Sequence, residues 1–174
     1  MLNRNIVYII GFMGSGKSTT GKNLASKLGW PFEDLDKSIE EYTGKAIPEI
    51  FSHHGEEYFR EVESDVLKSL ISHKNAVIAT GGGTPCYSDN MDFMLETGLT
   101  LYLKLTPRQL KSRLLISAGE RPLIKNLNNE ELLIFIKEKL AFREKWYNRA
   151  IITVEGFDPD INSLISIVRS GLNV

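Results

Sequence analysis

The most informative motif of this 174-residue chain is Gly11-Phe12-Met13-Gly14-Ser15-Gly16-Lys17-Ser18-Thr19. It follows an apolar run at residues 6–10 and precedes an amphipathic segment at residues 22–28. A strand, a G-x-x-x-x-G-K-[ST] loop and a helix, in this order, are typical of a loop that binds phosphate groups. The alternative is a plain glycine-rich turn, which is disfavoured because both flanks have the expected character. The stretch therefore predicts a nucleotide-phosphate site.

Each residue type in this loop has a physical reason. Backbone N–H groups must converge on phosphate oxygens, and a Cβ atom would obstruct both the dihedral angles and the close approach. Lys17 carries a positive charge that can reach the β- and γ-phosphates, and Ser18 presents a hydroxyl to Mg²⁺. The helix that follows directs its positive N-terminal end at the same phosphates.

Composition limits the class of protein. With 42% hydrophobic and 25% charged residues, the sequence is typical of a soluble globular protein, and we expect a single domain over residues 1–174. A net charge of −1 argues against broad electrostatic binding of nucleic acid. Cys86 is the only cysteine, so an intramolecular disulfide is impossible. No apolar stretch has the length of a membrane span. We expect a cytoplasmic monomer without nucleic-acid or membrane partners.

Short apolar runs alternate with helical patterns along the whole chain. Strands are predicted at residues 6–10, 32–35, 76–80, 99–105 and 151–154, and helices at 16–28, 47–72, 90–96, 107–116, 129–147 and 159–168. This alternation predicts βαβ units and a three-layer α/β/α fold with a five-stranded parallel sheet. The runs at 6–10, 76–80 and 151–154 are apolar throughout, which predicts strands covered on both faces. Thr106-Pro107 and Asp158-Pro159 are typical helix starts.

Several of the remaining polar motifs lie at the end of a predicted strand or after it, and ligands of open parallel sheets bind at this edge. Asp34 and Asp36 lie two residues apart, which places them on the same side of an extended strand. One carboxylate could hold Mg²⁺ through its water shell, while the other accepts a hydrogen bond or a proton from a substrate hydroxyl. Alone, this pair is better explained as a polar strand end; beside a phosphate loop the functional interpretation is favoured.

Two further motifs suit an anionic substrate. Arg60 and Glu63 share a helix face, and an arginine held by a carboxylate is oriented for bidentate contact with an anion. On spacing alone, an ordinary surface ion pair is the better interpretation. Gly81-Gly82-Gly83 is a stronger signal, because three successive glycines carry a large entropic cost unless a ligand or another backbone comes close.

Residues 113–125 form a cationic, loop-like segment that contains Gly119 and Arg121. A mobile lid of this kind would bring Arg121 onto the phosphates and exclude water during phosphoryl transfer. A solvated surface loop explains the segment equally well from sequence alone. Arg143 ends a helical pattern and either points into the site or pairs with the helix dipole.

Together these motifs resemble the shikimate kinase family, which belongs to the nucleoside-monophosphate-kinase-like P-loop proteins. The matches run in family order along nearly the whole chain: G-x-x-G-x-G-K-S-T at 11–19, D-x-D at 34–36, F-R-x-x-E at 59–63, T-G-G-G at 80–83, R-P-L at 121–123 and R-x-x-x-Y at 143–147. The resemblance implies ATP-dependent phosphorylation of the 3-hydroxyl of shikimate, in aromatic amino-acid biosynthesis.

The resemblance also implies a role for each matching residue. ATP and its Mg²⁺ would contact Gly14, Ser15, Gly16, Lys17, Ser18, Thr19, Arg113 and Arg121. Lys17 bridges to the transferred group, Ser18 and Asp34 hold Mg²⁺, and Arg113 flanks the adenine. Shikimate would contact Asp36, Arg60, Gly81, Gly82 and Arg143. In this scheme Asp36 is the best candidate for the base, and Arg60 and Arg143 grip the carboxylate of shikimate.

Other functions remain open at this point. A kinase for another small hydroxy acid, such as gluconate, fits the same fold, although Asp36 with Arg60 and Arg143 favours shikimate. A nucleoside monophosphate kinase should have a longer lid. A shikimate-binding regulatory module without turnover is disfavoured because Lys17 and Asp34 are retained and no domain is fused. A GTPase is disfavoured because no N-K-x-D motif occurs.

Overall fold

The computed structural model describes residues 5–72, 75–116, 124, 126–156 and 158–172. Five parallel strands form one sheet in the order β2-β3-β1-β4-β5. The strands are β1 (Asn5–Ile10), β2 (Phe32–Asp34), β3 (Asn75–Ala79), β4 (Leu99–Lys104) and β5 (Ile152–Glu155). The helices are α1 (Lys17–Leu28), α2 (Leu35–Thr43), α3 (Ile47–Ser69), α4 (Asn90–Thr97), α5 (Pro107–Ile116), α6 (Asn129–Tyr147) and α7 (Ile161–Leu172), with 3₁₀ turns at Leu70–Ser72 and Thr84–Cys86.

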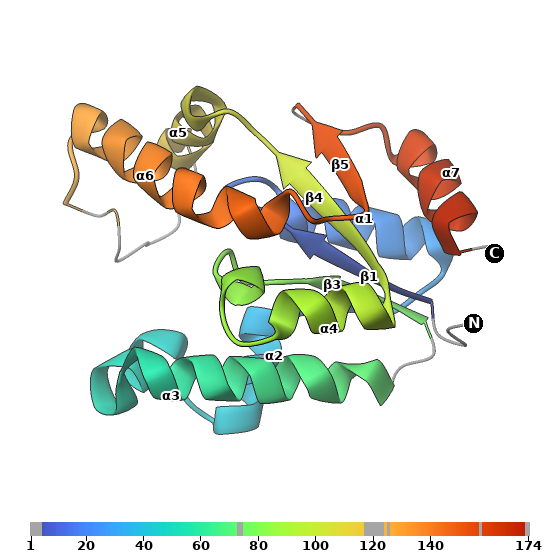
Figure 1. Ribbon diagram of the computed structural model, residues 1–174, viewed down its shortest axis with the longest axis horizontal. Coiled ribbons are helices and arrows are strands. Elements are labelled where there is room, and N and C mark those ends of the chain that lie inside the picture. The colour runs from blue at the N-terminus through green and yellow to red at the C-terminus, as the bar shows by residue number, and fades with distance from the viewer. Residues whose placement is uncertain (1–4, 73–74, 117–123, 125, 157, 173–174) are drawn as a thin grey trace.

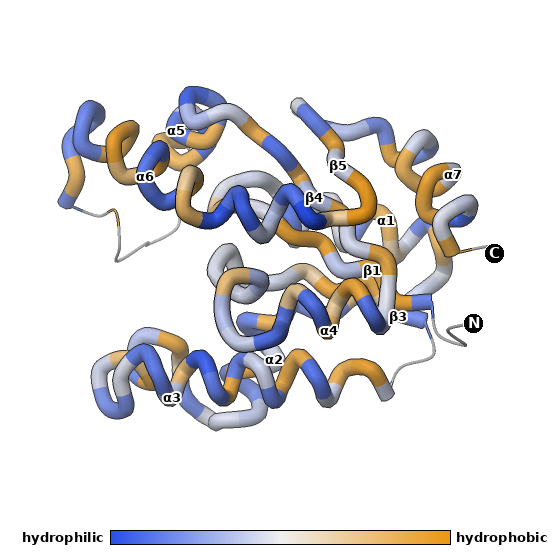
Figure 2. Tube along the Cα trace, in the orientation of Figure 1, coloured by the Kyte–Doolittle hydropathy of each residue, from blue (hydrophilic) through white to orange (hydrophobic). Residues whose placement is uncertain are grey.

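Helices cover both faces of the sheet, which gives the predicted three layers (Figure 1). Because side chains alternate along a strand, β1 sends Ile6, Tyr8 and Ile10 into one core and Val7 and Ile9 into the other. The first core lies against α2, α3, α4, α5 and α6, and the second lies against α1 and α7. Figure 2 shows the apolar stretches concentrated along the strands and on the helix faces turned toward them. The central strand β1 therefore carries the phosphate loop from a fully buried position.

Three predictions about the elements are wrong. Helix α2 begins at Leu35, directly after the short strand β2, and was not predicted because its nine residues follow β2 without a turn signal. The last strand is not covered on both faces: β5 lies at the sheet edge, and its residues alternate between partly buried and exposed. The last helix is capped by Asp160 rather than Asp158, because Asp160 accepts a hydrogen bond from the Ser163 backbone at 2.8 Å.

Helix α3 is broken at Gly55, whose φ of 81° and ψ of 178° lie outside the helical region. A positive φ of this size strains any residue with a Cβ, so glycine divides the helix into two segments. The second segment starts at Glu56 and carries Arg60 one turn later. Among the described helices, none is both long and apolar enough to cross a membrane.

Candidate active site

The loop between β1 and α1 has the backbone that a phosphate site requires. Gly16 is the N-cap of α1 and has a left-handed φ of 96°. Because glycine has no side chain to cap the helix, the first N–H groups of α1 remain available to phosphate oxygens. A Cβ on Gly11 would lie 2.8 Å from the carbonyl oxygen of Leu103, so this turn also needs glycine for space. Lys17 Nζ donates to the carbonyls of Gly11 and Phe12 at 2.9 and 3.0 Å, which folds it over the loop.

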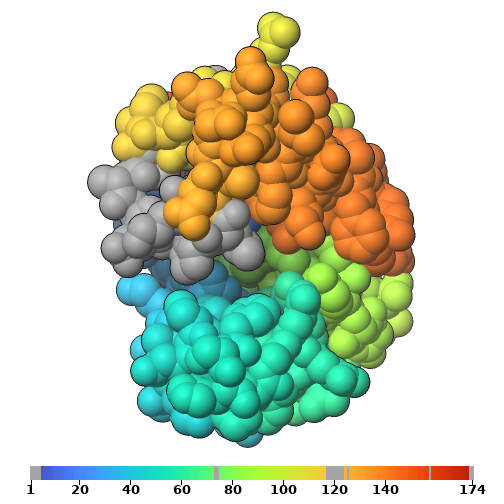
Figure 3. Space-filling view, turned by 90° about the vertical axis from the view of Figure 1, so that its left-hand side faces the viewer, coloured from blue at the N-terminus to red at the C-terminus, as the bar shows by residue number. Residues whose placement is uncertain are grey.

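A cleft of about 580 Å³ opens beside this loop. Its walls are formed by Met13, Gly14, Gly16, Lys17, Ser18, Thr19, Asp34, Asp36, Thr80, Gly81, Gly82, Arg113 and Ile116. Most of the predicted site residues therefore meet in one place, at the carboxyl ends of the strands. Figure 3 shows this side of the molecule hollowed between α3 below and α5 and α6 above. Ser15 is an exception, because its side chain is buried behind the loop and is not part of the cleft wall.

Asp34 and Asp36 both reach the cleft, but not for the reason that their spacing suggested. Asp34 ends β2, whereas Asp36 lies in the first turn of α2, so the two residues do not share one face of a strand. Ser18 Oγ donates to Asp34 Oδ2 at 2.8 Å. A hydroxyl and two carboxylates offer only oxygen ligands, which suit Mg²⁺. The described residues contain no group of three or more His, Cys, Asp or Glu side chains that could hold a metal alone.

The Asp36 carboxyl is electrostatically unusual. Its surroundings raise its pKa from 3.8 to about 6, chiefly because the protein around it displaces water. The negative charges of Asp34, Glu63 and Glu40 raise the pKa further, and the positive charge of Lys17 opposes them. The side chain remains open to the cleft. A carboxylate with a pKa close to neutrality suits the transfer of a proton from a hydroxyl.

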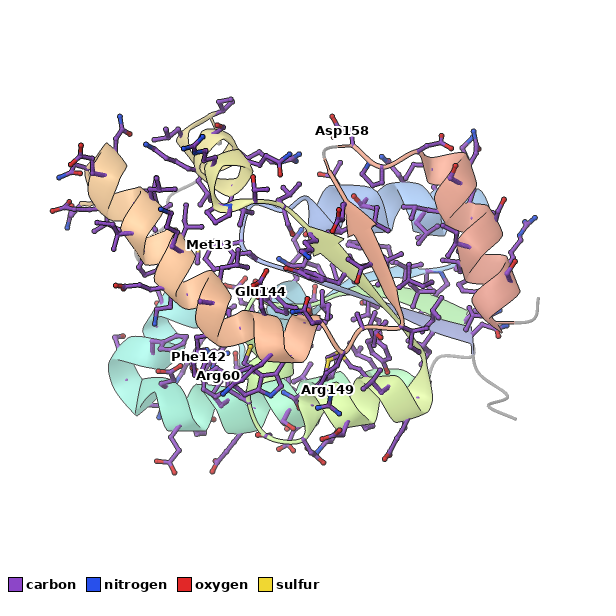
Figure 4. All side chains as sticks on the ribbon, turned by 45° about the horizontal axis from the view of Figure 1, so that its top comes forward. Met13, Arg60, Phe142, Glu144, Arg149 and Asp158 are labelled. Carbon is purple, nitrogen blue, oxygen red and sulfur yellow. The ribbon has the colours of Figure 1, made fainter. Side chains whose placement is uncertain are left out.

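Arg60 is not the surface ion pair that its spacing alone suggested. Its Nη1 donates to Glu63 Oε2 at 2.8 Å, and the Glu63 side chain is only 1% exposed. Thr84 Oγ1 donates to the other Glu63 oxygen at 2.6 Å. Burial alone would lower the pKa of Arg60, but Glu63 and Glu56 raise it above the ordinary value. Arg60, labelled in Figure 4, is therefore a fixed cation.

The loop Gly81-Gly82-Gly83 brings three predicted residues together. A Cβ on Gly81 would lie 3.1 Å from Asp36 Oδ1, and a Cβ on Gly82 would lie 3.1 Å from Arg143 Nη1. A Cβ on Gly83 would lie 2.9 Å from both Nη1 and Nη2 of Arg60. Glycine is favoured here by the close side chains rather than by its dihedral angles, because none of the three has a positive φ. The carboxylates of Asp36 and Glu63 and two guanidinium groups thus line a single loop next to the phosphate site.

Arg143 reaches this loop from α6, so the interpretation as a mere dipole partner is wrong. Its guanidinium carbon lies 5.3 Å from the ring centroid of Phe12. One turn later, the Tyr147 hydroxyl donates to the carbonyl oxygen of Gly82. Tyr147 is fully buried, so this hydrogen bond anchors α6 to the glycine loop. The position of Arg143 is thereby linked to that of Gly82.

Arg113 lies on α5, so the loop predicted to start at residue 113 is helical as far as Ile116. Its Nη2 lies 3.2 Å from where a Cβ on Gly16 would be, next to the phosphate loop. Its Nη1 lies 3.8 Å from a carboxylate oxygen of Asp158, which follows β5. Arg121 and the rest of 117–123 lie outside the described residues.

The structure also identifies residues that sequence reasoning missed. Glu56 binds Arg60 at 3.0 Å, and the Tyr87 ring centroid lies 3.8 Å from the Arg60 guanidinium carbon. The spacing of four between Glu56 and Arg60 was a usable signal. Tyr87 and Thr84 reach Arg60 and Glu63 only through the fold, and no local pattern indicates them.

Comparison with known proteins agrees with this geometry. A model of the shikimate kinase family matches residues 13–165. The chain belongs to the shikimate kinase family. Shikimate kinase of Parabacteroides distasonis is 44% identical over 149 residues, which cover 86% of each chain. Shikimate kinase of Persephonella marina is 42% identical over 170 residues, covering 95% of this chain and 99% of that protein.

Solved structures agree as well. Shikimate kinase from Bacteroides thetaiotaomicron superposes with a TM-score of 0.89 at 37% identity, covering 98% of this chain and 99% of that one. Shikimate kinase from Acinetobacter baumannii, solved in complex with shikimate, gives a TM-score of 0.82 at 34% identity over 99% and 95% of the chains. A gluconokinase from Sinorhizobium meliloti shares the fold alone, at 16% identity and a TM-score of 0.55. The predicted family, fold and kinase activity are confirmed.

Proposed function

We propose that this chain transfers the γ-phosphoryl group of ATP to the 3-hydroxyl of shikimate, with the residue roles given below. The observation that carries the proposal is the glycine loop, where Asp36, Arg60 and Arg143 lie against three successive glycines beside the phosphate loop. A small anionic polyol needs a carboxylate for its hydroxyls and guanidinium groups for its own carboxylate. These are the groups gathered here.

The nucleotide half of the site is formed by the phosphate loop and the start of α1. Backbone N–H groups of this loop bind phosphate oxygens, and Lys17 moves from the loop carbonyls to the transferred group. Arg113 lies beside Gly16 and extends the cationic wall toward the loop after β5. Arg121 stays a prediction for the same half of the site.

Ser18 and Asp34 would hold Mg²⁺, because their oxygens are joined by a hydrogen bond at the mouth of the cleft. A bound Mg²⁺ neutralises phosphate charge and orients the phosphates, and it usually keeps several waters. With phosphate oxygens and waters as the other ligands, Mg²⁺ needs only two protein oxygens, from Ser18 and Asp34. It therefore fits a site without a larger cluster of acidic side chains among the described residues.

Asp36 acts on the acceptor hydroxyl. In its ionised form it accepts the hydroxyl proton as the oxygen attacks the γ-phosphorus and the bond to the ADP oxygen breaks. Its raised pKa makes it a stronger proton acceptor than an ordinary aspartate. Arg60 and Arg143 hold the shikimate carboxylate at the other end of the ring, which fixes the hydroxyl relative to Asp36. A cytoplasmic, monomeric enzyme without nucleic-acid or membrane partners stays a prediction.

The test is ADP release by the purified protein with ATP and Mg²⁺, comparing shikimate, gluconate, AMP and no acceptor. Strong release with shikimate alone is expected. Release with another acceptor would support the role of the phosphate loop in binding ATP, but Asp36, Arg60 and Arg143 would then bind a substrate other than shikimate. Shikimate binding without ADP release would refute turnover and leave a binding module.

A further inference from the structure

Arg60 is held by two carboxylates that differ sharply in mobility. Glu63 is 1% exposed and is itself fixed by the buried hydroxyl of Thr84. Glu56 has a side chain that is 55% exposed and lies at the start of the second segment of α3, directly after the break at Gly55. Glu63 is therefore a permanent partner of Arg60, whereas Glu56 can exchange its contacts with solvent or a ligand.

Glu56 occupies Arg60 in the way that a ligand carboxylate would. Its Oε1 accepts hydrogen bonds from Nη2 at 3.0 Å and from Nε at 3.3 Å, so it covers one edge of the guanidinium fork. This edge is one of the two where a planar carboxylate binds an arginine in bidentate fashion. Together with the bond to Glu63, three of the five N–H groups of Arg60 are engaged by carboxylates of this chain.

Glu56 also has alternative partners. It shares a hydrogen bond with Tyr87, whose ring stacks on the Arg60 guanidinium at 3.8 Å. The positive charge of Lys139, on α6, acts on Glu56 as well. The hydrogen bond from Arg60 is the largest of the effects that lower the pKa of Glu56. If Glu56 leaves Arg60, the hydrogen bond with Tyr87 and the positive charge of Lys139 can still stabilise its carboxylate.

The carboxylate of a substrate would be the third carboxylate at Arg60, after those of Glu56 and Glu63, and these two negative charges would repel it. Like charges repel, and Arg143 is the second guanidinium that lies against the glycine loop. We propose that Glu56 is an internal competitor for the substrate carboxylate: it holds the exposed edge of Arg60 until the carboxylate of the substrate displaces it. This inference rests on the proposed role of Arg60 in binding that carboxylate.

The competing explanation is that Glu56 positions Arg60 and helps binding. The two explanations predict opposite signs. Removing a competitor strengthens substrate binding, whereas removing a positioning group weakens it. Glu56→Gln keeps the size of the side chain and removes its charge. Glu57→Gln is the matched control, because Glu57 is also an exposed glutamate on α3 and, among the described residues, makes no hydrogen bond to Arg60.

The experiment measures shikimate affinity by calorimetric titration, and KM and kcat by ADP release, in the unaltered chain and both variants. An exposed ion pair of this kind contributes up to about 1 kcal/mol, so we expect Glu56→Gln to lower the Kd and KM for shikimate about 2- to 5-fold. We expect kcat and the KM for ATP to stay within about 2-fold, and Glu57→Gln to leave all four values unchanged. The methyl ester of shikimate, which has no carboxylate charge, should not gain affinity.

An unchanged or raised Kd for shikimate in Glu56→Gln would overturn the inference. An equal gain in Glu57→Gln would also overturn it, because general charge and not competition at Arg60 would then be responsible. These results differ from failure of the proposed function, in which the unaltered chain binds no shikimate and both proposals fall together.

Discussion

Replacement of Asp36 by asparagine should slow the enzyme and stabilise the fold at the same time. The variant keeps the size of the side chain but cannot accept a proton from the acceptor hydroxyl. Loss of a general base typically costs about 10²- to 10⁴-fold in rate, so we expect a fall in kcat of this order. The pH profile adds a second signature. Activity of the unaltered chain requires ionised Asp36, so kcat/KM should fall below pH 6, following the pKa of about 6.

The stability effect has a definite sign. The folded-state pKa of Asp36 is raised from 3.8 to about 6, so the ionised carboxylate destabilises the fold. This cost is absent below pH 3.8, grows as the pH rises toward 6, and is complete above it. Two pKa units correspond to at most about 3 kcal/mol, and water in the open cleft screens this to about 1 kcal/mol. Asp36→Asn should be more stable than the unaltered chain by about this amount at pH 7.5.

Urea denaturation at pH 7.5 and pH 4.5, with both proteins, measures the difference. The stabilising effect of asparagine should shrink at pH 4.5, because the unaltered Asp36 is then protonated in the folded state. The same stability difference at both pH values would show that the raised pKa is not its cause. Near-normal turnover in a folded Asp36→Asn variant would remove Asp36 from the mechanism.

Three further substitutions probe the two halves of the site. Arg143→Lys should raise the KM for shikimate about 10-fold or more and leave the KM for ATP unchanged, because an ammonium cannot form the bidentate contact of a guanidinium. Equal effects on both KM values in steady-state kinetics would contradict that role. Gly83→Ala should also raise the KM for shikimate, since its Cβ would lie 2.9 Å from both Nη atoms of Arg60 and push the guanidinium aside; an unchanged KM would show that Arg60 does not bind the substrate. Ser18→Ala should raise the Mg²⁺ concentration needed for half-maximal activity, measured by titrating Mg²⁺ at fixed ATP, and an unaltered Mg²⁺ curve would exclude its hydroxyl from the metal site.

The fold was largely predictable because its signals are local. In the part of the chain that the structure describes, alternating apolar runs and helical patterns identified all five strands and six of the seven helices to within a few residues. Helix α2 was not predicted, because it has no local signal of its own. It starts at Leu35 immediately after β2, and the extended-strand prediction covered its first two residues, Leu35 and Asp36. The position of β5 at the edge of the sheet could not be predicted either, since its apolar residues do not indicate that it pairs with β4 alone.

The site was predictable where chain order and residue type carry the chemistry. The phosphate loop and the glycine loop follow strands and Asp34 ends one, and the sheet edge brings them together. The burial of Glu63 could not be predicted, because it depends on Thr84, which lies 21 residues away in the sequence. The same holds for Tyr87 against Arg60. Such contacts are set by tertiary packing, and a single sequence contains no periodicity that would indicate them.

The three glycines of the loop have a consequence for how this chain can evolve. Gly82 faces the side chain of Arg143 and Gly83 faces that of Arg60, whereas Gly81 faces three side chains, those of Thr84, Asp36 and Glu63. Since none of the three has a positive φ, the constraint at each position comes from the facing side chains and not from the backbone of the glycine. A larger residue becomes acceptable only where the facing side chain is shortened or withdrawn. Evolution toward a different acceptor should therefore replace a glycine of this loop together with a side chain that faces it, while the phosphate loop stays unchanged.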